Sequence, residues 1–364
     1  MKKKLIIFMP SIEKGGVEKN FFAISNFLTD YIEKITIITA NNNHNNKINN
    51  KIFIKCPSNN FWNNKKRIFK YIICIYLFIC EIINTKDKII ILSFQANLFA
   101  IVIAKIFNKK IIVRTNSSPT SYINNKIKKV IFYLILRLAD KIIVNSKDAK
   151  KYLYKILKLK SECIYNPCSV QLIKKLANQI INFKFFKKYK GLKIITIGRL
   201  SEEKDHLTLL KAFTEVIKIK NARLLILGSG NYKKQTQDYI NINKLNKYVK
   251  IIDHKDNPYP YLKMSDLFIL TSKFEGLPNV LLESLALKKY IISTDCLTGP
   301  KEILANGKYG DLIQIRNYNE LYNAIIKFKK NAYFSKKIND GYKSLSRFNY
   351  SNNCKKYLNY INQC

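Results

Sequence analysis

The chain has few of the side chains that bind metal ions in structural sites. It contains only three histidines, His44, His206 and His254, in 364 residues. Its eight cysteines are scattered, and none of them forms a CxxC pair. A structural zinc site needs a full set of such ligands at short spacings, so we expect none. Because no export signal is evident, we expect free thiols in the cytoplasm.

Long hydrophobic runs are also missing. The longest, Tyr71–Cys80, lies between Lys70 and Glu81 and is about half of the ~20 residues that a membrane-spanning helix requires. A buried helix is the simpler interpretation of this run, and an interfacial segment is the alternative. The start, MKKKLIIFMPS, has a basic head but a short apolar run, which a first buried strand explains better than an export signal.

Acidic residues are scarce, with 24 against 65 basic ones, which gives a net charge of +41. This excess indicates an anionic partner such as nucleic acid, acidic lipid or a phosphate ligand. A compositional bias explains it equally well, because the chain is rich in Ile, Lys, Asn, Tyr and Phe, which A+T-rich codons specify. Asn41–Asn46 and Asn59–Asn64 fit the same bias and are predicted to be polar loops.

Short apolar runs alternate with longer helical patterns along the whole chain. Its length suits two domains. The runs are nearly all hydrophobic, which is typical of parallel strands covered by helices on both faces. The strands predicted in the first half are Leu5–Phe8, Ile35–Thr39, Ile52–Lys55, Lys88–Leu92, Lys110–Val113 and Ile142–Asn145. The helices predicted between them include Val17–Leu28, Arg67–Ile83 and Lys126–Asp140.

The alternation stops after Asn166-Pro167 and then restarts. The strands predicted in the second half are Leu192–Ile197, Ala222–Leu227, Val249–Ile252, Leu267–Leu270 and Tyr290–Ser293. We therefore expect one domain over residues 1–170, a basic linker over 171–191 and a second domain over 192–344. Ligands bind at the carboxyl ends of strands in such sheets, so two facing sheets would form a site in the cleft between them.

The most informative segment is FEGLPNVLLESLA, which carries Glu275 and Glu283. The tight turn Gly276-Leu277-Pro278 precedes a helix predicted to begin near Asn279. The spacing places both carboxylates on one helix face, or one on the loop and one on the helix behind it. Such a pair can hold two hydroxyl-rich parts of one ligand, which indicates a sugar nucleotide. Glu283 is costly to bury without a partner, and the alternative is that it faces solvent.

Glycine-containing turns follow three of the predicted strands. They are Gly15-Gly16, Gly198 and Gly228-Ser229-Gly230. Glycine lets the backbone approach a ligand, and a helix N-terminus favours an anion. Arg199 and Lys204, next to the second turn, would add positive charge suited to a diphosphate. An ordinary strand-to-helix connection is the alternative at each turn, and it is the simpler interpretation of Gly15-Gly16 and Gly228-Ser229-Gly230.

Taken in this order, these segments resemble the GT-B glycosyltransferases of family 4. The family's E-x7-E signature matches Glu275 and Glu283, and its phosphate clamp matches Arg199 and Lys204 in GRLSEEKDHLTLLKAF. Its N-terminal glycine loop matches GGVEKN, and STDCLTGPKEIL resembles the subgroup that uses UDP-linked hexoses or N-acetylhexosamines. The resemblance implies an α/β fold with two Rossmann-like, doubly wound parallel sheets facing across a cleft. Residues 345–364 are similar to the closing helix that returns to the first domain.

The resemblance also implies a reaction and its residues. The enzyme would transfer a hexose or N-acetylhexosamine from a UDP-sugar, with retention and without a metal ion, to a lipid-linked glycan or surface polysaccharide precursor. The first domain would bind the acceptor and the second the nucleotide sugar. Arg199 and Lys204 would bind the donor diphosphate, Glu283 the ribose and Glu275 the donor sugar. The other implied contacts are Gly15, Gly16, Gly198, Gly228, Gly276, Leu277, Pro278 and Asn279.

One departure from the family concerns a histidine that many members carry near the donor sugar. This chain has IIVRTNSSPT there, so Asn116 is the candidate catalytic residue. Asparagine can hydrogen-bond a sugar hydroxyl but cannot take up a proton. A catalytically degenerate protein that only binds partners is therefore an alternative. A basic nucleic-acid-binding protein is a further one, although we find no motif for it and expect no nucleic-acid partner.

One amphipathic segment bears on localisation. Asn124–Arg137, NNKIKKVIFYLILR, places lysines beside an apolar stripe. Such a helix can lie on anionic lipid, which would make the protein peripheral to the inner face of the plasma membrane. Packing against the protein core is the alternative.

Overall fold

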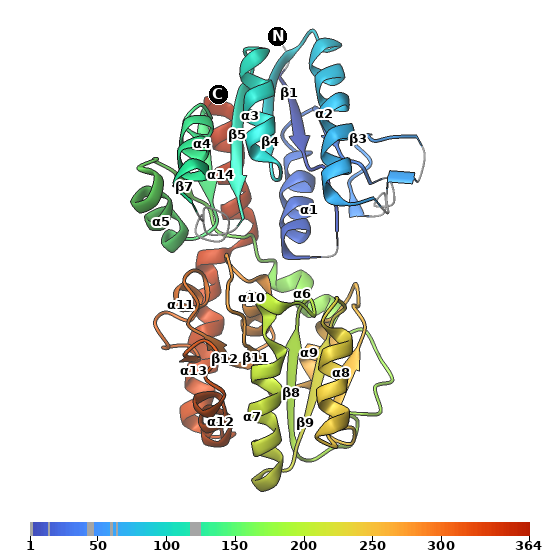
Figure 1. Ribbon diagram of the computed structural model, residues 1–364, viewed down its shortest axis with the longest axis vertical. Helices are drawn as coiled ribbons and strands as arrows, with labels where there is room; N and C mark the ends of the chain where they lie inside the picture. The colour runs from blue at the N-terminus through green and yellow to red at the C-terminus, as the bar shows by residue number, and fades with distance from the viewer. Residues whose placement is uncertain (1–2, 14, 42–46, 59–60, 63–64, 117–124) are drawn as a thin grey trace. The chain divides into compact units, whose positions relative to one another are not determined.

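The computed structural model describes residues 3–13, 15–41, 47–58, 61–62, 65–116 and 125–364. Its contacts divide the chain into two compact units, residues 1–167 with 348–364, and residues 168–347. Each unit contains one parallel sheet (Figure 1). Residues 171–191, predicted as a linker, lie in the second unit, where they carry most of α6 (Val170–Ala177) and the buried Phe183 and Phe186.

The first unit is built on a seven-stranded sheet in the order β3-β2-β1-β4-β5-β6-β7. Six of its strands confirm the predicted ones to within two residues at each end. The seventh, β7, escapes prediction because it is only two residues long and lacks an apolar run. The strands are β1 (Lys3–Phe8), β2 (Lys34–Ile38), β3 (Ile52–Lys55), β4 (Lys88–Ser93), β5 (Lys110–Thr115), β6 (Lys141–Val144) and β7 (Glu162–Cys163).

Helices cover both faces of this first sheet, as its uniformly apolar strands require. One face packs against α2 (Arg67–Ile83), α3 (Asn97–Ile106), α4 (Lys126–Leu136) and α5 (Lys147–Leu157). The other face packs against α1 (Gly16–Leu28) and the C-terminal helix α14 (Tyr350–Gln363). None of the described helices has the length and apolar character that crossing a bilayer demands.

The helix predicted over Lys126–Asp140 ends earlier, at Leu136. Asp140 is used in the turn that follows, where its Oδ2 accepts a hydrogen bond from the Ile111 backbone at 2.8 Å. Lys105 pairs with the same carboxylate at 2.6 Å. These bonds fix the turn at the start of β6, so the helix cannot continue through it. Asn124, at the start of the amphipathic segment, lies outside the described residues.

The second unit is built on a six-stranded sheet in the order β10-β9-β8-β11-β12-β13. Its strands are β8 (Leu192–Ile197), β9 (Ala222–Leu227), β10 (Val249–Ile252), β11 (Leu267–Leu270), β12 (Tyr290–Thr294) and β13 (Asp311–Ile313). Its helices after α6 are α7 (His206–Ile219), α8 (Lys233–Ile242), α9 (Tyr259–Met264), α10 (Asn279–Ala286), α11 (Pro300–Ile303), α12 (Tyr318–Lys327) and α13 (Ala332–Lys343). The predicted class, two doubly wound parallel sheets, is confirmed. Only the three-residue β13 was not predicted.

The guanidinium of Arg114, at the end of β5, is fully buried and joins α14 to the first sheet. Its Nε donates to Tyr357 Oη at 2.8 Å, and one terminal nitrogen donates to Asn166 Oδ1 at 2.6 Å. The other terminal nitrogen donates to the side-chain oxygen of Asn116, and the guanidinium lies 5.6 Å from the ring centre of Phe94. Since Tyr357 belongs to α14, the expected return of the final helix to the first domain is confirmed.

Removing the Tyr357 hydroxyl should destabilise the first unit. Tyr357→Phe keeps the buried ring but leaves a buried charged donor without this partner, which costs about 1–3 kcal/mol. Urea unfolding of the full chain should show a lower midpoint for this variant. Tyr31→Phe, at an exposed tyrosine, is the matched control. Equal urea midpoints for the two variants would contradict a stabilising role for the Arg114–Tyr357 hydrogen bond.

Candidate active site

The predicted site residues of the second unit gather at one edge of its sheet. Strands β9, β8, β11 and β12 are neighbours and parallel, so their carboxyl ends meet at that edge. The loops that leave these four strands carry Gly228, Arg199, Glu275 and Gly299. Such an edge is where ligands bind in open α/β sheets.

The first two loops cross with their backbones in contact. A Cβ placed on Gly228 would lie 1.8 Å from the carbonyl oxygen of Gly198, so no side chain fits there. The Leu200 backbone donates to the Ser229 carbonyl at 3.0 Å across the same crossing. The glycine at 228 is therefore required by packing alone, and its predicted ligand contact stays a prediction.

An ion pair joins the loop after β8 to the loop after β11. Lys204 Nζ lies 2.5 Å from Glu275 Oε1, and the Ser272 hydroxyl donates to the same oxygen at 2.7 Å. The side chains of Lys204 and Glu275 are 22% and 10% exposed. A pair so far removed from water holds its geometry strongly, because either charge alone would be buried without compensation.

The end of β12 and the loop after it hold the Glu275 loop from the other side. Thr298 Oγ1 donates to the Glu275 carbonyl at 2.5 Å, and Thr294 Oγ1 donates to the Ser272 carbonyl at 2.6 Å. Gly299 has a φ of +91°, and a Cβ there would lie 2.1 Å from the Gly276 carbonyl oxygen. The backbone around Glu275 is thus fixed from two neighbouring strands.

Glu283 lies on α10, behind the loop that carries Glu275, and is only 5% exposed. Tyr259 Oη, from α9, donates to Glu283 Oε1 at 3.3 Å. Burial, and then the charge of Glu283, raise the pKa of Tyr259, which keeps this hydroxyl a donor. The interpretation that Glu283 faces solvent is wrong, and the arrangement of one acid on the loop and one on the helix is confirmed. Tyr259 carried no sequence signal beyond its place in an aromatic segment.

The remaining predicted residues lie in different places. Arg199 is exposed directly after Gly198, at the same edge of the second sheet. Gly15 and Gly16 lie at the start of α1 in the first unit, where Gly15 is the extended N-cap residue. Asn116, also in the first unit, donates from Nδ2 to the Phe94 carbonyl at 2.9 Å and accepts from Arg114. Both ends of its amide are therefore engaged within that unit.

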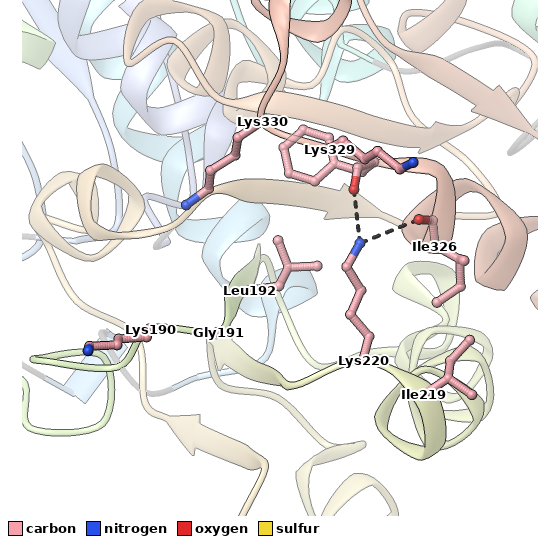
Figure 2. A pocket seen from close by; sticks show the side chains of 9 residues that line it. Lys190, Gly191, Leu192, Ile219, Lys220, Ile326, Lys329 and Lys330 are labelled. Atoms are coloured by element: carbon pink, nitrogen blue, oxygen red, sulfur yellow. Dashed lines mark hydrogen bonds between the residues drawn. The ribbon is translucent and has the colours of Figure 1, made fainter.

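A separate cavity of about 510 Å³ lies at the amino-terminal edge of the second sheet, away from these residues. Lys190, Lys220 and Lys330 line it, and Figure 2 shows Lys220 donating to backbone carbonyls. Lys220 Nζ bonds to the Phe328 carbonyl at 2.9 Å and to two more from the end of α12. Burial, and then Lys329, lower the pKa of Lys220. This lysine therefore caps a helix, and the cavity contains none of the predicted site residues.

Across the described ranges, no group of three or more His, Cys, Asp or Glu side chains is placed to hold a metal ion. Lys204 and Arg199 are cationic groups at the carboxyl edge. What this edge offers chemically is positive charge beside two fixed carboxylates, which suits a ligand with phosphates and hydroxyls.

Comparison with known proteins gives a family for this architecture. The family model of "Glycosyl transferases group 1" matches residues 178–344. An uncharacterized glycosyltransferase of Methanocaldococcus jannaschii is 36% identical over 217 residues, which are 56% of this chain and 53% of that protein. The match thus spans about half the length of that relative. A 4-alpha-N-acetylgalactosaminyltransferase of Campylobacter jejuni is 26% identical over 347 residues, with 89% of each chain covered.

Solved structures share the whole fold. An Anabaena protein in complex with UDP superposes with a TM-score of 0.79 at 14% identity, and both chains are fully covered. A glycosyltransferase from Rickettsia africae gives a TM-score of 0.80 at 18% identity, covering 100% of this chain and 98% of that one. The two parallel sheets, the returning helix and these matches define a glycosyltransferase with the GT-B fold. Residues 178–344, most of the second unit, belong to the group 1 glycosyltransferases.

His206 lies beside the ion pair and was not predicted to matter. It begins α7 two residues after Lys204 and is almost fully buried, and its Nδ1 has no hydrogen-bond partner. Burial, and then the charge of Lys204, lower its pKa from 6.5 to about 4. The imidazole is therefore neutral in the folded protein over a wide range of pH.

Acidification should destabilise the protein through His206. Its pKa is about 4 when folded and 6.5 when exposed, so the unfolded chain binds the extra proton between these values. Stability is then complete above pH 6.5 and is lost as the pH falls toward 4, by about 2 kcal/mol between pH 7.5 and pH 5. Urea unfolding at both pH values should show a smaller pH dependence for His206→Gln than for wild type. His254→Gln should keep the wild-type dependence, and equal slopes for all three proteins would contradict the assignment.

Proposed function

We propose that the protein is a retaining glycosyltransferase that moves a hexose or N-acetylhexosamine from a UDP-sugar to a lipid-linked glycan or surface polysaccharide precursor. The observation that carries the proposal is the desolvated Lys204–Glu275 pair at the carboxyl edge of the second sheet, with the buried Glu283 on the adjoining helix. Two relatives support the ligand classes. The Anabaena structure contains UDP, and the Campylobacter jejuni relative is named for an acceptor on diphospho-undecaprenol.

Lys204 and Arg199 bind the donor diphosphate in this proposal. When the sugar leaves, negative charge builds up on the β-phosphate, and fixed cations nearby lower the energy of that state. Lys204 is already oriented by Glu275 at 2.5 Å, so little reorganisation is needed. Because these side chains supply the positive charge, the proposed reaction uses no metal ion.

The two carboxylates hold the hydroxyl-rich parts of the donor. Glu283, oriented by Tyr259, binds the ribose hydroxyls, and Glu275 contacts the donor sugar near its reacting carbon. That carbon gains positive charge as the bond to phosphate breaks, which a nearby carboxylate stabilises. Gly276, Leu277, Pro278, Asn279, Gly198 and Gly228 complete the donor contacts.

The first unit supplies the acceptor side. We propose that Gly15 and Gly16 lie close to the donor phosphates or the acceptor, and that Asn116 lies near the donor sugar. Asn116 cannot accept a proton, so the departing phosphate would serve as the base for the attacking hydroxyl. The acceptor is proposed to be lipid-linked, which places the enzyme at the cytoplasmic face of a membrane.

Removing the Lys204 charge should weaken nucleotide diphosphate binding. Lys204→Ala deletes one charge-assisted contact and leaves Glu275 unpaired beside the phosphates, so the Kd for UDP should rise roughly 10- to 100-fold in isothermal titration. Binding of uridine, which has no phosphate, should be unchanged. Lys218→Ala, at an exposed lysine paired with Glu215 on α7, is the control. An unchanged Kd for UDP in Lys204→Ala would refute the diphosphate assignment.

Changing Glu283 should weaken the binding of nucleotides that have ribose hydroxyls. Glu283→Gln keeps the shape of the side chain but loses the charge-assisted hydrogen bonds to the 2′- and 3′-hydroxyls, so UDP should bind about 10-fold more weakly. The 2′,3′-dideoxy analogue of UDP should bind wild type and variant with the same Kd. A variant that loses affinity equally for both nucleotides would instead indicate a general packing defect at α10.

A further inference from the structure

Three neighbouring helices of the first unit expose an unusual amount of apolar surface. On α4, Ile127, Val130, Ile131 and Leu134 are exposed, and only Leu136 is buried. The outer stripe of α3 runs through Phe99, Val102 and Ile106, at the spacing of one helix face. Ile72 and Tyr76 continue it on α2. Apolar patches of this extent are rare on monomeric proteins and mark interaction sites.

The three stripes face the same way. Helices α2, α3 and α4 contribute their inner sides to one core cluster, on one face of the first sheet. α3 packs against both α2 and α4, and the three cover that face of the sheet together in Figure 1. Their outer sides therefore form one continuous surface, which we call the α2–α4 face.

Composition alone does not explain the α2–α4 face. Helices α1 and α14 cover the opposite face of the same sheet and come from the same Ile-rich chain. Every residue of these two helices is described, and neither exposes a large hydrophobic side chain. Most of the exposed apolar side chains of the unit thus lie on the side of α2, α3 and α4, although Phe53 on β3 and Tyr31 after α1 are also exposed.

The charge of the α2–α4 face is positive. Lys126, Lys128 and Lys129 are all exposed on α4, which carries no acidic residue. The one acidic residue in the sequences of the three helices is Glu81, which is buried and pairs with Lys4 and Lys55 at 2.7 Å each. A second copy of this face would be repelled by its like charge. A surface that is apolar within and anionic outside complements it.

We infer that the α2–α4 face docks onto the surface of an anionic lipid bilayer. The helices lie in the plane of the interface, their apolar side chains enter the boundary between headgroups and acyl chains, and the α4 lysines contact lipid phosphates. This inference goes beyond the proposed transfer reaction, because it requires neither donor nor acceptor. It assigns the docking to three helices, where the sequence indicated the segment over α4 and, only as an alternative, the run Tyr71–Cys80 in α2.

Vesicle sedimentation of the full chain without nucleotide tests this inference. Wild type should bind phosphatidylglycerol vesicles at least 10-fold more tightly than phosphatidylcholine vesicles, and less tightly as salt rises. Ile127→Gln with Ile131→Gln should lower binding to phosphatidylglycerol at least 10-fold. Ile219→Gln with Ile242→Gln, at exposed isoleucines on α7 and α8, should bind like wild type.

The charge contribution is tested separately. Changing Lys126, Lys128 and Lys129 to Gln should abolish most of the salt dependence. The same three-charge change at the exposed Lys234, Lys336 and Lys343 should preserve it. Negligible binding of wild type to both vesicles would overturn the inference, as would equal losses in the control variants. A dimer in solution that Ile127→Gln with Ile131→Gln dissolves, with no vesicle binding, would reassign the face to self-association. UDP titration of the same preparations keeps these outcomes separate from the donor site.

Discussion

The ion pair between Lys204 and Glu275 connects the parts of the second unit on which the proposed chemistry depends. It joins loops from adjacent strands, and each loop is also fixed by its backbone, one by the crossing at Gly228 and the other by Thr298. The pair is poorly hydrated, so neither charge is stable without the other. A ligand that brings its own negative charge can share the lysine without a large rearrangement of either loop. The Lys204–Glu275 pair therefore supplies the positive charge for a ligand and also links the two loops that carry it.

The first unit also buries a cation at the end of a strand, but it does so with different partners. Arg114 is held by two amides and a tyrosine hydroxyl. None of these three partners is a carboxylate, so they orient the guanidinium without cancelling its charge. The same contacts fix Asn116 and the C-terminal helix. The sequence position where the family resemblance leads one to expect a histidine is thus part of a polar network that organises the whole unit.

Much of the fold followed from local pattern. Ile52–Lys55, Ala222–Leu227 and Leu267–Leu270 were predicted to the residue, because a short run of apolar residues between polar turns has few other solutions in a parallel sheet. The strands β7 and β13 were not predicted, because two or three residues are too few to show a hydrophobic pattern. The loop-and-helix arrangement of Glu275 and Glu283 was one of two that the spacing allowed.

Contacts across long sequence separations were beyond prediction. Tyr259 meets Glu283 from another helix, and Arg114 meets Tyr357 across 243 positions. Neither contact leaves a trace in spacing or composition, because each partner alone resembles any other buried polar residue. The α2–α4 face was visible in part, since the sequence of α4 is amphipathic. Its continuation over α2 and α3 depends on which sides of those helices the sheet covers.

The crossing at Gly228 limits how the enzyme can change. With the Gly198 carbonyl occupying the place of any side chain, this loop cannot acquire a new functional group at its closest point to the neighbouring strand. In the proposed function, a change in the donor sugar has to come from side chains at other positions of this edge. The backbone crossing at Gly228 is therefore fixed by packing, while side chains elsewhere at the carboxyl edge of the second sheet can vary.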